Sequence, residues 1–208
     1  MKKISIAVIA LSAIILSACN SGGNTSEHEG HDMSKMGDTT NAATTNDKEA
    51  KLVAVKFTDV DIKVAASIKE TVDHYLHVKN ALASDNADEA AKGGKAMVST
   101  LSKLDKSLFT ADQKNAFDEI QDDLKEHAEH IGKNAGDIKH QREHFIGMSE
   151  DIYTLVTNFG GGRVLYHDHC PMVQDNKGAM WVSEIKDIKN PYFGAQMPNC
   201  GSVEEVIQ

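Results

Sequence analysis

The sequence lacks the short motifs by which many enzymes can be recognised. It has three cysteines but no C-x-x-C pair, so it carries neither a dithiol redox motif nor a haem attachment motif. It also lacks a nucleophile elbow and a phosphate-binding loop. Acidic residues outnumber basic ones by 31 to 22, a net charge of −9 that argues against nucleic acid or anionic lipid as the main partner. We therefore expect a binding protein and not an enzyme.

Long apolar runs are also missing after the first nineteen residues. Residues 1–19 have a basic start and a short apolar segment, which is typical of a secretion signal. The signal ends in Leu16-Ser17-Ala18-Cys19, which matches the bacterial lipobox and predicts lipidation of Cys19. Asn20 then favours the outer membrane, with the body facing the periplasm and held by a lipid anchor only. The alternative is an ordinary signal peptide with a chance cysteine.

Residues 20–54 are rich in small and polar residues and show no apolar periodicity, which predicts a disordered tether. Within the tether lie His28, His31, Met33 and Met36. Histidine-rich tracts often bind metal, and thioethers favour Cu(I). The tether could therefore capture metal ions, or it could be a solvated spacer in which these residues are coincidental.

Residues 55–159 show helical periodicity in four segments separated by short breaks. The pattern predicts an all-α protein, an antiparallel up-down four-helix bundle followed by a loop-rich C-terminal extension. We expect helices near 59–83 and 87–108, a third that opens with a capping box at Thr110, and a fourth that Asp137 caps. Small residues at the start of the second segment, such as Ala90 and Gly94, would let a neighbouring helix come close.

Histidine pairs recur along the predicted helices at spacings of three or four, so both members of a pair share a helix face. The pairs are His74 and His77, His127 and His130, and His140 and His144. Bundles do build metal sites from inward-facing histidines. For each pair taken alone, however, a surface position or a satisfied core position is the better expectation, and the helical phase predicts that His140 points away from the core.

The C-terminal extension, residues 160–208, differs in kind from the bundle. It holds all three prolines, the only tryptophan, and two soft-ligand pairs, Cys170 with Met172 and Met197 with Cys200. If the extension folds back on itself, these sulfur atoms could hold Cu(I) or Ag(I), and His167 and His169 could complete the site. The alternative is a disulfide between the two cysteines, which an oxidising compartment favours. Both can hold if the cysteines cycle between thiolate and disulfide.

Several motifs in the second half of the chain resemble a known family. They are Asp137 to Phe145, Cys170-Pro171-Met172, Gly178 to Trp181, Asn190 to Gly194, and Met197 to Gly201. Over residues 55–208 the chain resembles a helical domain of unknown function found in bacterial exported lipoproteins and fused to CusB-type copper/silver efflux adaptor subunits. The resemblance implies a periplasmic, copper-related protein whose partner would be a heavy-metal efflux adaptor or another envelope protein.

Two hypotheses about function follow from these patterns. The first is an envelope lipoprotein that binds soft heavy-metal ions, Cu(I) and also Ag(I), for sequestration or delivery to an efflux system. The second is a disulfide-stapled helical protein that acts as a protein-interaction module without metal.

Overall fold

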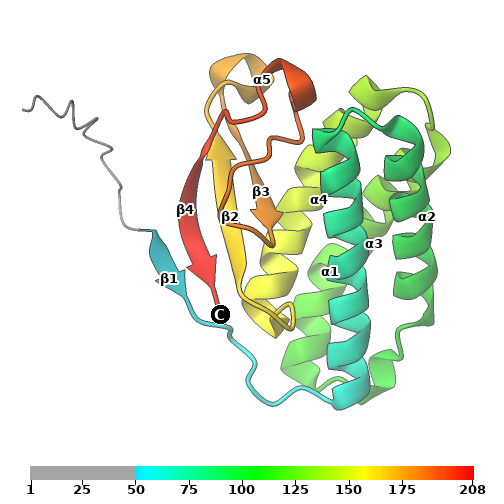
Figure 1. The fold of residues 1–208 in the computed structure, drawn as a ribbon. Helices are drawn as coiled ribbons and strands as arrows, with labels where there is room; N and C mark the ends of the chain where they lie inside the picture. The colour runs from blue at the N-terminus through cyan, green and yellow to red at the C-terminus, as the bar shows by residue number, and fades with distance from the viewer. Residues whose placement is uncertain (1–49) are drawn as a thin grey trace, which may run out of the picture. The chain divides into compact units, whose positions relative to one another are not determined.

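Four long helices packed side by side dominate the structure, and a small sheet lies against them (Figure 1). The computed structural model describes residues 50–208. The helices are α1 (Ile62–Ala83), α2 (Ala87–Lys103), α3 (Ala111–Lys133) and α4 (Ile138–Phe159). Within this range no helix combines the length and the apolar character needed to cross a bilayer. The four predicted helical segments are thus confirmed, although α2 ends at Lys103 and the short helix η1 (Lys106–Leu108) follows it.

Side chains at the start of each helix explain why the boundaries could be predicted. Asp61, Asn86, Thr110 and Asp137 each accept a hydrogen bond from a backbone N–H of the first turn. At Thr110 the predicted capping box is complete, because the side chain of Gln113 also accepts from the backbone N–H of Thr110. Such caps satisfy donors that a helix start otherwise leaves unpaired.

The expected close approach of two helices is present between α2 and α3. A Cβ placed on Gly94 would lie 2.7 Å from the carbonyl oxygen of Ala128 and 2.9 Å from the amide nitrogen of Gly132. Both contacts are with backbone atoms, so no side-chain movement could relieve them. Glycine at position 94 therefore sets the distance between α2 and α3.

A four-stranded sheet accompanies the bundle, with one strand before α1 and three after α4, so the prediction of an all-α protein is wrong for these parts of the chain. The strands are β1 (Lys51–Val53), β2 (Leu165–Cys170), β3 (Ala179–Ser183) and β4 (Ser202–Ile207), in the spatial order β1-β4-β2-β3. β1 pairs with β4 in parallel, and the other pairs are antiparallel. β1 also lies within the residues that were expected to be tether.

Two short helices complete the extension, α5 (Val173–Asn176) after β2 and η2 (Gly194–Gln196) before β4. The sheet is fixed to the bundle by buried polar contacts. The hydroxyl of Tyr75 on α1 accepts a hydrogen bond from the backbone N–H of Val182 at 2.9 Å. Lys79, whose side chain is fully buried, donates to Glu184 at 2.7 Å. These contacts place β2 and β3 against the helices, and with them the histidines of β2.

Cys170 and Cys200 form a disulfide, with their Cα atoms 5.7 Å apart. Cys170 is the last residue of β2, and Cys200 lies two residues before β4. The disulfide therefore joins the end of one strand to the segment that enters its neighbour. In this state neither cysteine offers a thiolate to a metal ion.

Candidate functional site

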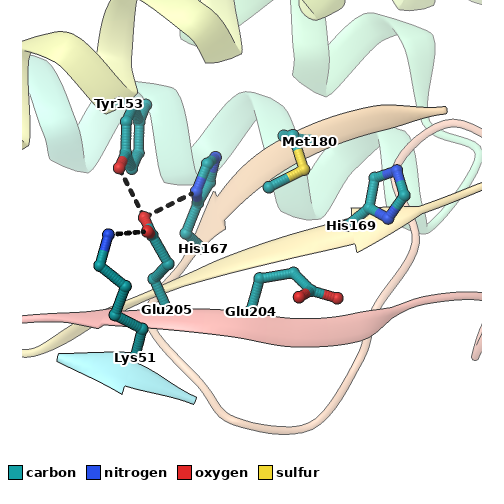
Figure 2. Close-up of a pocket in the computed structure, with 7 residues that line it drawn as sticks. All are labelled: Lys51, Tyr153, His167, His169, Met180, Glu204 and Glu205. Atoms are coloured by element: carbon teal, nitrogen blue, oxygen red, sulfur yellow. Dashed lines mark hydrogen bonds and ion pairs between the residues drawn. The ribbon is translucent and has the colours of Figure 1, made fainter. Parts of the chain in front are cut away.

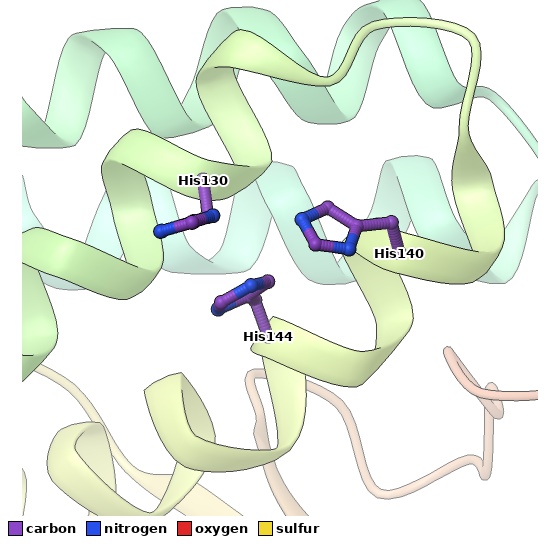
Figure 3. Close-up of side chains that lie close together, drawn as sticks. All are labelled: His130, His140 and His144. Carbon is purple, nitrogen blue, oxygen red and sulfur yellow. The ribbon is translucent and has the colours of Figure 1, made fainter.

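The first candidate site is formed by histidines where α3 ends and α4 begins. His127 and His130 lie in the last two turns of α3, and His140 and His144 lie in the first two turns of α4. Residues 134–137 connect the two helices, so α4 turns back along α3 and brings His140 and His144 beside His130 (Figure 3). The connection therefore converts two separate surface pairs into one cluster.

Three of these histidines lie close enough together to hold one metal ion. One ring nitrogen from each of His130, His140 and His144 lies within 4.8 Å of the others. The rings of His130 and His144 stack with their centroids 4.0 Å apart, and the ring of His140 meets that of His144 edge-on at 4.6 Å (Figure 3). All three side chains are half-buried. The helical phase of α4 alone did not reveal that His140 faces His130 and His144.

His127 extends the cluster along α3. Its Nδ1 atom lies 3.2 Å from Nδ1 of His144, so one of the two nitrogens donates and the other accepts. A Cβ placed on Gly147 would lie 2.2 Å from Nε2 of His127, so the imidazole fits only because α4 has no side chain there. When Nδ1 of His144 is the donor, its Nε2 carries the lone pair that a metal ion could bind.

The surroundings keep the inner imidazoles neutral. Burial lowers the pKa of His127 below its usual value. Burial also lowers the pKa of His144, and the neighbouring His130, His140 and His127 lower it further. Carboxylates lie at the rim, with Glu143 Oε2 3.7 Å from His140 Nδ1 and Glu126 Oε1 3.9 Å from His130 Nε2. A neutral imidazole has the free lone pair that a metal requires.

A second candidate site is a hollow of about 530 Å³ over the sheet (Figure 2). Its lining comes from α4 and all four strands: Lys51, Tyr153, His167, His169, Met180, Glu204 and Glu205. The hollow thus brings together two residues predicted as metal ligands, His167 and His169, with a thioether from the neighbouring strand.

Glu205 organises one end of this hollow. Its carboxylate accepts hydrogen bonds from the hydroxyl of Tyr153 at 2.5 Å and from Nζ of Lys51 at 3.1 Å, and it lies 3.4 Å from Nδ1 of His167. Burial alone would raise the pKa of Glu205, but these partners outweigh it and hold that pKa below its usual value. Burial, together with Glu205, raises the pKa of Tyr153 to about 12. Tyr153 and Lys51 therefore stabilise Glu205 as a carboxylate.

The sulfur atoms predicted as metal ligands do not line the hollow that contains His167 and His169. Cys170 is fully buried in its disulfide, and Met172 is 47% exposed. Met172 lines a separate hollow beside α5, and Met197 is half-buried in the loop after η2. The proposed ligands of the tether, His28, His31, Met33 and Met36, lie outside the described residues, as does Cys19.

Comparison with known proteins gives one match. Residues 71–163 are similar to a family described as Protein of unknown function (DUF3347). The matched segment contains most of α1 and all of α2, α3 and α4, including the four clustered histidines, and it ends before β2. No curated protein and no solved structure matches the chain. The predicted helical domain of unknown function is confirmed at this level, and the family description names no activity.

One signal in the sequence could have revealed the histidine cluster. His130 and His140 lie almost equally far from the centre of the connection at residues 134–137, and so do His127 and His144. In an antiparallel helical hairpin, residues at equal distances from the turn lie opposite each other. The spacing of one pair on its own helix does not contain this signal, because the other half of the cluster lies on the neighbouring helix.

Proposed function

We propose that this protein binds transition-metal ions in the bacterial cell envelope and that His130, His140 and His144 form its binding site. The observation that carries the proposal is the convergence of three ring nitrogens within 4.8 Å of one another. Three histidines with an open fourth position form a familiar set of ligands for Zn²⁺. Imidazole also binds copper and nickel, and among the divalent ions of the first transition row Cu²⁺ binds most tightly.

The surroundings of the four histidines favour metal binding over a chance grouping of side chains. Four imidazoles lie together at the end of the bundle, where protonation of more than one would bring like charges into contact. A bound cation makes the neutral forms favourable, because each nitrogen then donates its lone pair. The contact between His127 and His144 is the kind of outer hydrogen bond that orients metal-binding histidines.

The wider role that we propose is copper sequestration or delivery to an efflux system, without catalysis. The lipobox-like sequence before Cys19 supports a lipid-anchored position in the envelope, and the acidic composition suits a cation-binding protein. His28, His31, Met33 and Met36 would supply ions to the folded part. The helical segment similar to DUF3347 would then carry the metal site.

A second candidate function is that of an interaction module that binds another envelope protein without metal. The observation in its favour is the disulfide between Cys170 and Cys200, which removes both thiolates from the predicted sulfur site. This alternative predicts that the clustered histidines contribute nothing to metal affinity.

The test is a competition titration of the full chain with Zn²⁺ and Cu²⁺, comparing two double variants. One variant is His140→Gln with His144→Gln. The matched control is His74→Gln with His77→Gln, which removes two histidines from one face of α1 and leaves the cluster intact. Loss of a single outer-shell partner weakens metal binding by about 10- to 100-fold, so loss of two ligands should cost at least about 100-fold.

The control should bind as the unsubstituted chain does, since binding by the tether is common to all three proteins. Equal affinity in the two double variants would refute the histidine site. That outcome would favour the second candidate function, the binding of another envelope protein.

A further inference from the structure

The hollow over the sheet is independent of the histidine cluster between α3 and α4. Tyr153, which lines the hollow, is nine residues from His144 on the same helix, or about 14 Å at 1.5 Å per residue. The two sites share no residue. The ligand types also differ, because the hollow includes a thioether.

We propose that His167, His169 and Met180 in this hollow form a second metal site, one that takes a soft monovalent ion, Cu(I) or Ag(I). This inference goes beyond the divalent site proposed above. His169 and Met180 are directly paired across β2 and β3, which places their Cβ atoms about 4.5–5.5 Å apart. His167 lies two residues from His169 and lines the same hollow. In Figure 2 the thioether of Met180 lies between the two imidazoles.

Two contacts hold His167 in the orientation that a metal ligand needs. The ring stacks on Tyr153 with centroids 3.9 Å apart, and its Nδ1 faces the carboxylate of Glu205 at 3.4 Å. Glu205 is in turn fixed by Tyr153 and Lys51. A carboxylate on one ring nitrogen is the usual outer partner of a histidine that binds metal through the other nitrogen. Nε2 of His167 is therefore the atom that would bind the ion.

The ligand set determines the kind of ion. A thioether is a neutral, polarizable donor that binds Cu(I) and similar soft ions and adds little affinity for Mg²⁺ or Ca²⁺. Two imidazoles and one thioether give a low-coordinate site without a free thiol. The site therefore works while Cys170 and Cys200 remain in their disulfide, as an oxidising compartment favours. In the alternative, Met180 merely packs against the ring of His169 as a sulfur–aromatic contact.

The experiment is a silver titration of the full chain with ¹³C-labelled methionine methyl groups, read by NMR. Silver(I) is the probe because it is soft and does not change oxidation state in the buffer. The chain carries His140→Gln and His144→Gln, so that the site between α3 and α4 cannot contribute. The methyl signal of Met180 is assigned through bonds, and its loss in Met180→Leu checks the assignment. With added silver its chemical shift should change until one silver ion is bound in the hollow and then stay constant.

Two variants and a control complete the test. His169→Gln should weaken silver binding in the hollow, read from the Met180 methyl signal, about tenfold or more, and Glu205→Gln should weaken it about 10- to 100-fold. The control is Met172→Leu, which removes an exposed methionine that lines a different hollow and should leave the Met180 shift unchanged. A Met180 signal that stays in place at saturating silver overturns the proposal, as does an equal loss in Met172→Leu. Because the decisive signal is read in a chain with the hollow intact, an unfolded variant does not affect the conclusion.

Discussion

Removing the disulfide should reveal how much it contributes to stability and whether metal binding needs its sulfur atoms. The substitution pair is Cys170→Ala with Cys200→Ser, chosen because Cys170 is fully buried and Cys200 is half-buried. The two cysteines are 30 residues apart in sequence. For a closed loop of this length, the lost constraint on the unfolded chain corresponds to about 4 kcal/mol of unfolding free energy. In a body of this size that is a fall in Tm of roughly 8–16 °C.

The assay is thermal unfolding followed by circular dichroism, with and without reductant. The unsubstituted chain in reductant should melt like the double variant, and reductant should not change the variant. A loss below about 1 kcal/mol would refute the reasoning, because it would mean that the unfolded chain gains little freedom from the open loop. The same variant should retain the silver-induced shift of Met180, since the proposed site uses no thiolate.

Two further predictions concern stability. Gly94→Ala should destabilise the protein by about 1–3 kcal/mol in urea unfolding, because its new Cβ would lie 2.7 Å from the carbonyl oxygen of Ala128; unchanged stability would mean that α2 and α3 can separate freely. Burial, with Asp123 and Glu150 nearby, raises the pKa of Asp151 to about 7, and its Oδ2 atom is buried without a hydrogen-bond partner. In the unfolded chain Asp151 ionises near pH 4, whereas in the folded protein it stays protonated up to about pH 7. The free energy of unfolding therefore falls as the pH rises from about 4, and the loss is complete above about pH 7. Because the side chain is half exposed, we discount that cost to roughly 1–2 kcal/mol. Asp151→Asn should add that amount at pH 8 and almost nothing at pH 4, and an equal effect at both pH values would contradict the assignment.

The helices could be predicted because their signals are local. Capping residues such as Thr110 and Asp137 lie within a turn of the groups that they satisfy, and apolar residues recur on one face of each helix. Gly94 was informative for the same reason, since a small residue on the buried face of a helix implies a close neighbour.

The pairing of β2 with β3 is a local hairpin, but the full sheet could not be predicted because the pairing of β4 with β1 and with β2 is not local. Apolar and polar residues alternate only weakly along β2, because three of its six residues, His167, Asp168 and His169, are consecutive polar residues. β1 has three residues and pairs with a strand about 150 residues away. Nothing near Lys51 in the sequence points to Glu205, so the hollow and the outer partners of His167 appear only in three dimensions. The disulfide was one of two open alternatives, and the structure contains it.

The order of the strands constrains the order in which parts of this protein can fold. β4 is the last strand along the chain, yet it lies between β1 and β2 and pairs with both. A chain that is synthesised from its N-terminal end contains β1 long before its partner strand β4. The four helices can pack before β1 pairs with β4, because most of their contacts are between helices that follow one another in the chain. The carboxylate of Glu205 arrives with β4, so the hollow over the sheet would be completed in the final step of folding, after the histidine cluster has formed.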